Sequence, residues 1–540
     1  MRARPGKAAL YEQLTADGIT HMFGNPGTVE QGFIDLVDNS PLDYVLTLHE
    51  SVAVGMADGY ARSTQQPGLV QLHSGVGLGN GIGMLYQAKR GGSPLVVLVG
   101  EAGVRYDALD AQMAADLVGM AEPVTKYATR VLDPSSVLRV VRRAVKMAMT
   151  PPMGPVLVVL PADVLDQVTT EPAIPTTIPS TRVTPEPSVI ATAADLLLSG
   201  EQPLVLMGDG VSVSGAQQQL TALAERLDAP IWGVNSSEVN VDTTHPLYRG
   251  QTGHMFGAVS SGIVSESDAV LIVGSYVFPE VFPELGNPFR DDAKIVHVDL
   301  DSYEIAKNLP VDLGIVADPH LTLTAISQEI DRRRPSTTPI GPTASQMEAS
   351  HVGEASEPES VPELFAARLA QRAPAELAVF DEALTASGTL TRYLPPRVPG
   401  RYFQTRGGSL GVGIPGALGI KLAHPELEVI GFTGDGGSMY TIQALWTAAR
   451  YGIAAKLVVC NNRRYQLLDD NIEQYWSELG ITPHVHPEAF DLSRPDIDFT
   501  ALARSLGVPA TRVEKPEQVD SAVTELLSHE GPFLVDLMTA

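Results

Sequence analysis

The stretch that decides the fold is Gly434-Asp435-Gly436-Gly437, together with the pair Asn461-Asn462 further along the chain. The apolar run Val429–Phe432 leads into the first motif, and the run Ala455–Cys460 leads into the second. Between them, Ser438–Tyr451 carries apolar residues at helical spacing, so the pattern predicts a strand, a helix and a second strand. Two parallel strands joined in this way deliver their polar ends to the same edge of a sheet.

The side chains at these two strand ends suit a metal ion. Asp435 and Asn462 offer a carboxylate and a carboxamide, the hard oxygen ligands that Mg²⁺ or Ca²⁺ prefers. Gly436 and Gly437 are predicted to open the helix, where free N–H groups and the helix dipole favour an anion. A cation beside such a helix start indicates a diphosphate-bearing cofactor. The plain alternative is two unrelated turns, because both motifs are common in loops.

The two motifs resemble the signature of the thiamine diphosphate (ThDP)-dependent enzymes, a Gly-Asp-Gly turn with a closing Asn-Asn. The resemblance implies that Asp435, Asn462 and the backbone carbonyl of Arg464 hold Mg²⁺ on the diphosphate. The same ligand set suits Ca²⁺. It also implies that the cofactor is surrounded by the remaining residues of the turn, Gly434, Gly436 and Gly437.

Length and charge narrow the choice of function. At 540 residues the chain has room for about three domains. A formal charge of −26, from 37 basic and 63 acidic residues, disfavours nucleic acid and anionic membranes as partners. The single cysteine, Cys460, excludes an intrachain disulfide framework and lies in a run expected to be buried. Neither a signal peptide nor a membrane-spanning run is recognisable, so we expect a cytoplasmic protein.

Two Pro/Ser/Thr-rich stretches, 167–188 and 333–361, are predicted linkers. They separate three predicted domains, which are 1–167, 189–332 and 362–540. Each domain alternates short Val/Ile/Leu runs with helical patterns, which indicates parallel sheets covered on both faces. Among the predicted strands are Pro203–Met207 and Ala269–Val273. We therefore expect an α/β protein of three doubly wound domains.

Three polar residues of the first domain follow strand-like runs. Thr28 lies in Phe-Gly-Asn-Pro-Gly-Thr, Glu50 ends Leu-His-Glu, and His73 lies in Leu-His-Ser-Gly-Val-Gly-Leu-Gly-Asn. In open α/β sheets ligands bind outside the carboxyl ends of the strands, so the three side chains should converge there. Structural explanations exist for single residues: a first-turn glutamate is stabilised by the helix dipole, and a strand-end histidine is readily satisfied by loop backbone.

These motifs resemble the pyrimidine-binding domain of benzoylformate decarboxylase-like ThDP enzymes. The resemblance implies that Glu50 bonds N1′ of the aminopyrimidine and promotes the imino tautomer that removes the thiazolium C2 proton. Such a base is required because the C2 proton is very weakly acidic. His73 would lie beside the substrate, and Thr28 would bind the substrate carboxylate in place of the family's serine. His49 is given no role, because on a strand it points away from Glu50.

The third domain carries a second glycine-rich stretch, 407–416, which fits G-x-G-x-x-G by letter and so raises a nicotinamide dehydrogenase as a rival. The context does not fit, since no Val/Ile-rich strand leads into the motif and Pro415 interrupts it. ThDP enzymes have similar sequence here. The resemblance implies that Leu410 wedges under the bent cofactor and that the carbonyl of Gly408 accepts from its 4′-amino group. Upstream, Thr385 is the matching hydroxyl donor to the diphosphate.

Two segments depart from the family's pattern. The stretch 274–282 has no histidine where benzoylformate decarboxylase has its second active-site histidine. Glu280 within it is a candidate substitute for that histidine, but we favour a surface residue. Leu467 and Asn471 make the predicted pocket bulkier and more polar, which argues against benzoylformate itself. The middle domain lacks a dinucleotide fingerprint after its first strand, so we expect no FAD.

The resemblance spans nearly the whole chain and implies pyrimidine-binding (PYR), middle and diphosphate-binding (PP) domains. It implies a ThDP- and Mg²⁺-dependent lyase that decarboxylates a 2-oxo acid non-oxidatively and releases an aldehyde. The alternative is an acetolactate synthase-like carboligase, which joins the decarboxylated acid to a second carbonyl compound. A ThDP-binding protein with little turnover is a third reading, which the intact Glu50 disfavours. The cofactor would lie between subunits, with a homodimer as the minimal active unit and a homotetramer as the expected assembly.

Overall fold

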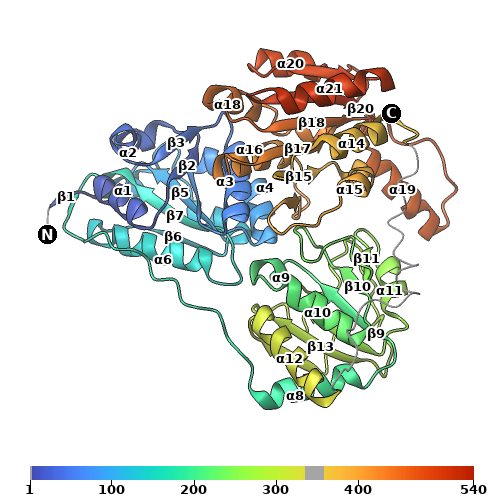
Figure 1. Ribbon diagram of the computed structural model, residues 1–540. Helices are drawn as coiled ribbons and strands as arrows, with labels where there is room; N and C mark the ends of the chain where they lie inside the picture. Colours follow the sequence, from blue (N-terminus) through green and yellow to red (C-terminus); the bar gives the residue numbers. More distant parts are fainter. Residues whose placement is uncertain (1–2, 335–357, 540) are drawn as a thin grey trace. The chain divides into compact units, whose positions relative to one another are not determined.

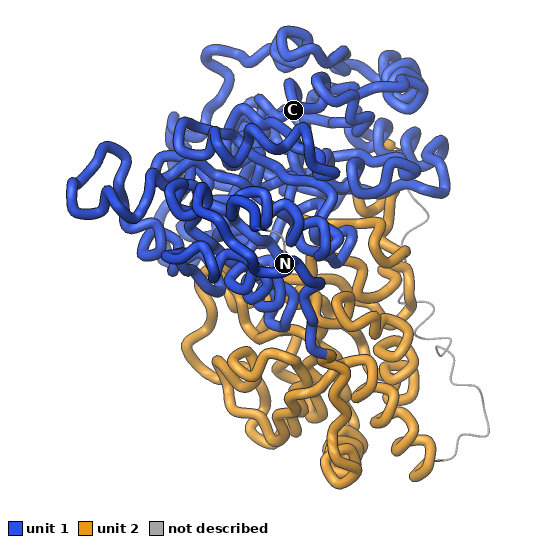
Figure 2. Tube along the Cα trace, turned by 90° about the vertical axis from the view of Figure 1, so that its left-hand side faces the viewer, with its two compact units in different colours: residues 1–179, 359–389, 405–540 blue, residues 180–358, 390–404 orange. Residues whose placement is uncertain are grey.

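The computed structural model describes residues 3–334 and 358–539 and contains three six-stranded sheets (Figure 1). The chain divides into two compact units (Figure 2). One unit, residues 1–179, 359–389 and 405–540, holds the first sheet and all of the third sheet except its short strand 402–404. The other unit, residues 180–358 and 390–404, holds the second sheet. The predicted class, α/β with three doubly wound domains, is confirmed.

The first sheet has the strand order β3-β2-β4-β5-β7-β6, and its neighbouring strands run parallel. One face is covered by α1 and α6 and the other by α3 and α4, as expected for a doubly wound sheet. The strands are β2 (His21–Gly24), β3 (Asp43–Leu46), β4 (Gly68–His73), β5 (Leu95–Glu101), β6 (Tyr127–Arg130) and β7 (Val156–Pro161). The helices are α1 (Gly6–Ala16), α3 (Glu50–Thr64), α4 (Ser74–Gly91) and α6 (Val137–Met149).

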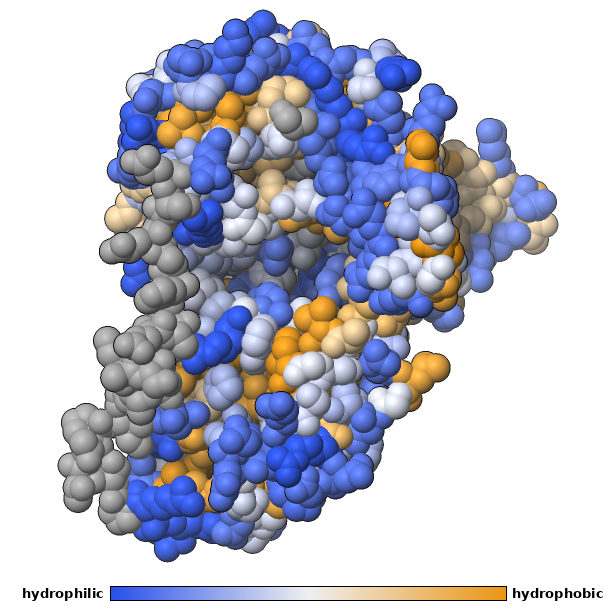
Figure 3. All heavy atoms as spheres, turned by 90° about the vertical axis from the view of Figure 1, so that its right-hand side faces the viewer, coloured by the Kyte–Doolittle hydropathy of each residue, from blue (hydrophilic) through white to orange (hydrophobic). Residues whose placement is uncertain are grey.

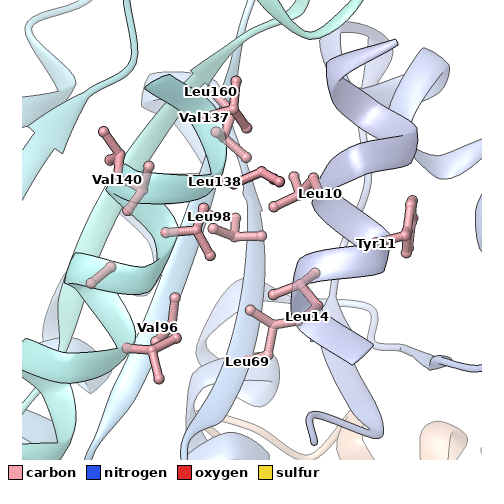
Figure 4. Close-up of a cluster of buried hydrophobic side chains, with 14 of the residues drawn as sticks. Leu10, Tyr11, Leu14, Leu69, Val96, Leu98, Val137, Leu138, Val140 and Leu160 are labelled. Atoms are coloured by element: carbon pink, nitrogen blue, oxygen red, sulfur yellow. The ribbon is translucent and has the colours of Figure 1, made fainter. Parts of the chain in front are cut away.

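The core of this domain lies between α1, α6 and the sheet (Figure 4). Leu10 and Leu14 of α1 face Leu69, Val96 and Leu98 of the strands, and all five are essentially without exposed surface. Each such side chain contributes about 1.5–3 kcal/mol on burial. The strand residues between them are buried on the opposite face, which explains why the strands read as continuous apolar runs.

The third sheet has the order β16-β15-β17-β18-β20-β19, and its pairs from β15 across to β19 run parallel. Numbered within each sheet, the first and third sheets share the order 2-1-3-4-6-5. In the sequence, the first and third domains share only a similar alternation of apolar runs and helical patterns. The strands are β15 (Leu377–Glu382), β16 (Tyr402–Gln404), β17 (Glu428–Gly434), β18 (Lys456–Asn461), β19 (Ala510–Val513) and β20 (Phe533–Met538).

Helix α3 packs closely against α16 (Gly413–Ala423), and this contact joins the first and third sheets (Figure 1). The approach depends on glycine, because a Cβ at Gly59 would lie 2.1 Å from the Gly416 carbonyl oxygen. The N-terminus of α16 is therefore held in place from both sides, by its own sheet and by the first domain.

The second sheet is parallel with the order β11-β10-β9-β12-β13-β14. Its β9 (Pro203–Met207) and β12 (Ala269–Val273) have the predicted bounds. The other strands are β10 (Ile231–Gly233), β11 (Tyr248–Gln251), β13 (Lys294–Asp299) and β14 (Leu313–Val316), and the main helices are α8 (Pro187–Leu198), α10 (Gln217–Leu227) and α12 (Pro319–Arg333).

The predicted helix 438–451 is wrong at its start. The chain forms a four-residue helix, α17 (Asp435–Ser438), then a turn, and only then α18 (Ala444–Tyr451). The turn forms because the Thr441 hydroxyl donates to the Gly411 carbonyl at 2.6 Å and draws the segment toward the glycine loop. The Gly-Asp-Gly motif after β17 therefore opens one short helical turn, α17, rather than the long predicted helix.

The two predicted linkers have different outcomes. The first begins with a short strand, β8 (Val168–Thr169), which pairs antiparallel with β1 (Arg4–Pro5), and the rest forms no helix or strand before α8. Residues 335–357 of the second lie outside the described residues, and α14 (Val361–Arg372) follows them.

Within the described ranges, no helix is long and apolar enough to cross a membrane. The face shown in Figure 3 is mostly hydrophilic and carries scattered hydrophobic patches, in keeping with the 63 acidic residues of the chain.

Candidate active site

Three adjacent strands of the first sheet bring the predicted PYR residues to one edge. Glu50 begins α3 after β3, Thr28 begins the short 3-10 helix η1 (Thr28–Glu30) after β2, and His73 is the last residue of β4. A Cβ at Gly77 would lie 3.1 Å from Glu50 Oε1 and 3.2 Å from His73 Cβ, so both side chains border the same space. The fold therefore brings Glu50 and His73 together, and it places Thr28 at the end of the neighbouring strand.

Glu50 is buried and held by two asparagines that the sequence reasoning missed. Asn25 donates to Oε1 at 3.2 Å and Asn80 donates to Oε2 at 2.9 Å. These neutral donors fix the direction of the carboxylate. His49 points elsewhere, as predicted: its Nδ1 accepts from the Ser51 N–H and caps α3.

His73 is paired with a second carboxylate, Glu30, which the sequence reasoning also missed. Glu30 Oε2 lies 2.8 Å from His73 Nδ1 and accepts from the Gly27 N–H at 3.0 Å. Burial raises the pKa of Glu30, and the bond to His73 opposes that rise. Space for the pair comes from Gly27 and Gly100, where a Cβ would lie 2.2 Å from His73 Nδ1 and 1.9 Å from Glu30 Oε1.

A cavity of about 430 Å³ adjoins the Glu30 side of this pair and is lined by Thr28, Glu30 and Gln71, among others. Among the described residues, Glu30 Oε1 and Gln71 Nε2 are buried without a hydrogen-bond partner. Thr28 itself is exposed, so its hydroxyl is accessible to a small molecule. The edge therefore combines an accessible hydroxyl, an oriented imidazole and two carboxylates.

Four adjacent strands of the third sheet, β16-β15-β17-β18, bring the predicted PP residues to a corresponding edge. Thr385 lies exposed in the 3-10 helix η6 (Leu384–Ala386) after β15. The remaining predicted residues follow the other three strands: Gly408 and Leu410 after β16, Gly434 to Gly437 at the end of β17, and Asn462 and Arg464 after β18.

The predicted metal ligands meet at the backbone of Arg464. Its N–H lies 3.2 Å from Asp435 Oδ2 and 2.9 Å from Asn462 Oδ1, so both side-chain oxygens converge on one residue. Burial raises the pKa of Asp435, which is opposed by bonds from backbone N–H groups alone. A buried carboxylate with only neutral donors suits a cation. Since the described residues contain no group of three or more His, Cys, Asp or Glu placed to hold a metal ion, a metal here would use this mixed set.

The structure also separates the two asparagines of the pair. Asn461 is the last residue of β18, and its Nδ2 donates to buried Asp536 at 2.9 Å. Since Asp536 lies in the neighbouring strand β20, this bond links two strands of the sheet. Asn462 is the residue that turns toward Asp435. The predicted metal ligand is this second asparagine.

The glycine loop offers backbone to a ligand. Gly408 has φ +76°, is exposed, and has no atom within 4 Å of a built Cβ. Gly411 has φ +94°, and a Cβ there would lie 2.6 Å from Tyr440 Cβ. Leu410 between them is half-buried. Open backbone on one side of a half-buried leucine fits the predicted receptor for the aminopyrimidine.

One sequence interpretation outside these edges is wrong. Glu280 is buried rather than a surface residue: the Ser260 hydroxyl donates to its Oε1, and its Oε2 has no partner among the described residues.

Three family models match the chain. They are the thiamine pyrophosphate enzyme N-terminal TPP binding domain (residues 4–120), central domain (190–326) and C-terminal TPP binding domain (385–537). The chain belongs to the thiamine pyrophosphate enzyme family. The cofactor named by these domains is thiamine diphosphate, which the sequence predicts.

The relatives cover the chain from end to end. Benzoylformate decarboxylase of Pseudomonas aeruginosa is 31% identical over 98% of both chains. A probable acetolactate synthase large subunit of Methanococcus aeolicus is 28% identical over 98% of this chain and 91% of its own length. A solved thiamine diphosphate-dependent 4-hydroxybenzoylformate decarboxylase of Rhodococcus jostii RHA1 superposes with a TM-score of 0.87 at 29% identity, covering 99% of each chain.

Proposed function

We propose that this enzyme decarboxylates a 2-oxo acid non-oxidatively and releases an aldehyde, using ThDP and Mg²⁺. The observation that carries the proposal is the pairing of His73 with Glu30 on the edge that also holds Glu50 and Thr28. The full-length similarity to a benzoylformate decarboxylase supports it.

The PP edge fits the cofactor and its metal. Asp435, Asn462 and the carbonyl of Arg464 would hold the divalent ion, either Mg²⁺ or Ca²⁺. The backbone at Gly408 and Leu410 would receive the aminopyrimidine, and Thr385 would donate to the diphosphate. When bound, ThDP supplies the carbon nucleophile and the electron sink that decarboxylation requires.

The PYR edge supplies the proton chemistry. Glu50 would hold a proton at N1′ of the aminopyrimidine, with its direction set by Asn25 and Asn80. Glu30 engages His73 Nδ1, which leaves Nε2 as the ring nitrogen that moves a proton to the product. Thr28 would bind the substrate carboxylate through its hydroxyl.

We further propose that the cofactor lies between the PYR domain of one subunit and the PP domain of another. A homodimer would then be the minimal active unit, with two dimers forming a homotetramer. The proposed domain boundaries remain 1–167, 189–332 and 362–540.

The second candidate is a carboligase of the acetolactate synthase kind. It is favoured by the segment 274–282, which lacks a histidine, and by the acetolactate synthase relatives that cover nearly the whole chain. Buried Glu280 is the carboxylate that this segment offers instead.

Product analysis separates the two candidates. The purified enzyme with ThDP and Mg²⁺ would be given a panel of 2-oxo acids, alone and with an added aldehyde, and the products identified by mass spectrometry. Free aldehyde and CO₂, lost in Glu50→Gln, would support the decarboxylase. A hydroxyketone or acetohydroxy acid with little free aldehyde would instead establish the carboligase.

A further inference from the structure

Glu382 is a buried carboxylate to which the proposed chemistry gives no part. It is the last residue of β15 and is 1% exposed. Burial raises its pKa to about 7, and four donated hydrogen bonds oppose that rise. A carboxylate kept in such a place has to be held by its donors, because an unsatisfied buried charge is costly.

All four donors belong to the glycine loop and the strand that carry the proposed cofactor site. Oε1 accepts from the backbone N–H groups of Gly411 at 2.7 Å and Val412 at 3.0 Å. Oε2 accepts from the N–H of Gly413 at 2.8 Å and from the hydroxyl of Thr433 at 3.1 Å. Three consecutive N–H groups of the glycine loop, at the start of α16, thus point at one side chain.

The fourth donor connects this loop to the metal turn. Thr433 is buried in β17 and directly precedes the Gly-Asp-Gly turn. A Cβ at Gly413 would lie 2.8 Å from Glu382 Oε2 and 2.9 Å from the Phe432 carbonyl oxygen, so loop, carboxylate and strand are in close contact. The side chain of Glu382 is therefore the bridge between the loop that carries Gly408 and Leu410 and strand β17, which leads directly into Asp435.

We propose that Glu382 is a positioning residue for the cofactor: it fixes the loop 407–413 against β17, and so sets where the aminopyrimidine half is received relative to the metal-held diphosphate. This inference rests on the proposed cofactor site. It concerns the affinity for ThDP and leaves the proton chemistry to the PYR edge.

The test is Glu382→Gln, which keeps the size of the side chain but turns an NH₂ group toward backbone donors. ThDP binding is measured by isothermal titration calorimetry with Mg²⁺, and kinetics give KM for ThDP and kcat at saturating ThDP. We expect the Kd and the KM for ThDP to rise by at least about tenfold, because bonds to a charged acceptor are lost. Saturating ThDP should restore kcat to within about threefold.

Two further variants make the result decisive. Glu428→Gln alters a carboxylate at the opposite end of β17 and should bind ThDP like the wild type. Thr433→Val removes the bond between the strand and Glu382, together with a 3.3 Å bond from the same hydroxyl to the Gly434 carbonyl. It should weaken ThDP binding roughly twofold to tenfold. If Glu382→Gln does not fold, ThDP binding by Thr433→Val tests the positioning role of Glu382 in its place.

The outcomes distinguish this inference from the proposed function. If the wild type does not bind ThDP, the cofactor proposal itself fails. If the wild type binds ThDP and folded Glu382→Gln binds it equally well, the positioning role is overturned while the cofactor site stands. If Glu382→Gln is unfolded, wild-type affinity in Thr433→Val overturns the positioning role in the same way. A fall in kcat that excess ThDP does not restore also overturns it.

Discussion

Replacing Glu30 by glutamine should separate activity from stability. The substitution keeps the size of the side chain and removes the charge that faces His73 Nδ1 at 2.8 Å. A hydrogen bond to a charged group contributes about 1.5–3 kcal/mol, and about 1.4 kcal/mol corresponds to a tenfold rate change. We therefore expect Glu30→Gln to lower kcat/KM roughly 10- to 150-fold.

The difference in stability between Glu30→Gln and the wild type should depend on pH. Burial raises the pKa of Glu30 above its ordinary 4.5, so the folded protein binds this proton more tightly than the unfolded chain does. The stability contributed by Glu30 is therefore present at low pH and is lost as the pH rises through its folded pKa. Since glutamine carries no charge, the Tm of Glu30→Gln relative to the wild type should increase as the pH rises above 4.5.

Steady-state kinetics with the 2-oxo acid identified by product analysis, and thermal unfolding at several pH values, check both parts. Glu12→Gln is the matched control, because Glu12 is an exposed carboxylate of the same domain that pairs with Arg4. Wild-type kcat/KM in Glu30→Gln would refute the reasoning about His73. A Tm difference that does not change with pH would refute the reasoning about burial.

Three other predictions concern the fold and the metal site. Gly59→Ala should destabilise the protein by about 1–3 kcal/mol in urea unfolding, because its Cβ would lie 2.1 Å from the Gly416 carbonyl oxygen; Gly79→Ala, in an open helical position, should not destabilise it. Asp435→Asn should weaken Mg²⁺-dependent ThDP binding by at least about tenfold in calorimetry, since a charged ligand is lost, and equal affinity would exclude Asp435 as a metal ligand. Cys460 should react with a thiol reagent only after unfolding, because burial raises its pKa to about 12, and labelling of the native protein would contradict this.

The strand ends were predictable because their signal is local. Continuous Val/Ile/Leu runs identify buried parallel strands, and two of them, Pro203–Met207 and Ala269–Val273, have the predicted bounds. The polar residue that follows such a run can be placed at the carboxyl edge from the sequence alone. This is why Glu50, His73 and Asp435 could be named as candidates before the fold was known.

The start of the predicted helix at Ser438 illustrates where local patterns mislead. Apolar spacing continues through the segment, but the Thr441 hydroxyl bonds to Gly411, a residue 30 positions earlier in the chain. A bond over that separation depends on which strands are neighbours, and the pattern of one segment carries no information about it. The helix therefore begins only at Ala444.

The sequence by itself determined the α/β class, the three sheets, the family resemblance and the order of the motifs, since each rests on residues close together in the chain. The tertiary structure alone decided the partners of the candidate residues. Glu30 meets His73 across 43 positions and Glu382 meets the glycine loop across 29 to 31. These contacts exist because parallel strands that are separated by whole helices in the chain become neighbours in the sheet, which places their ends, and the side chains on them, at one edge.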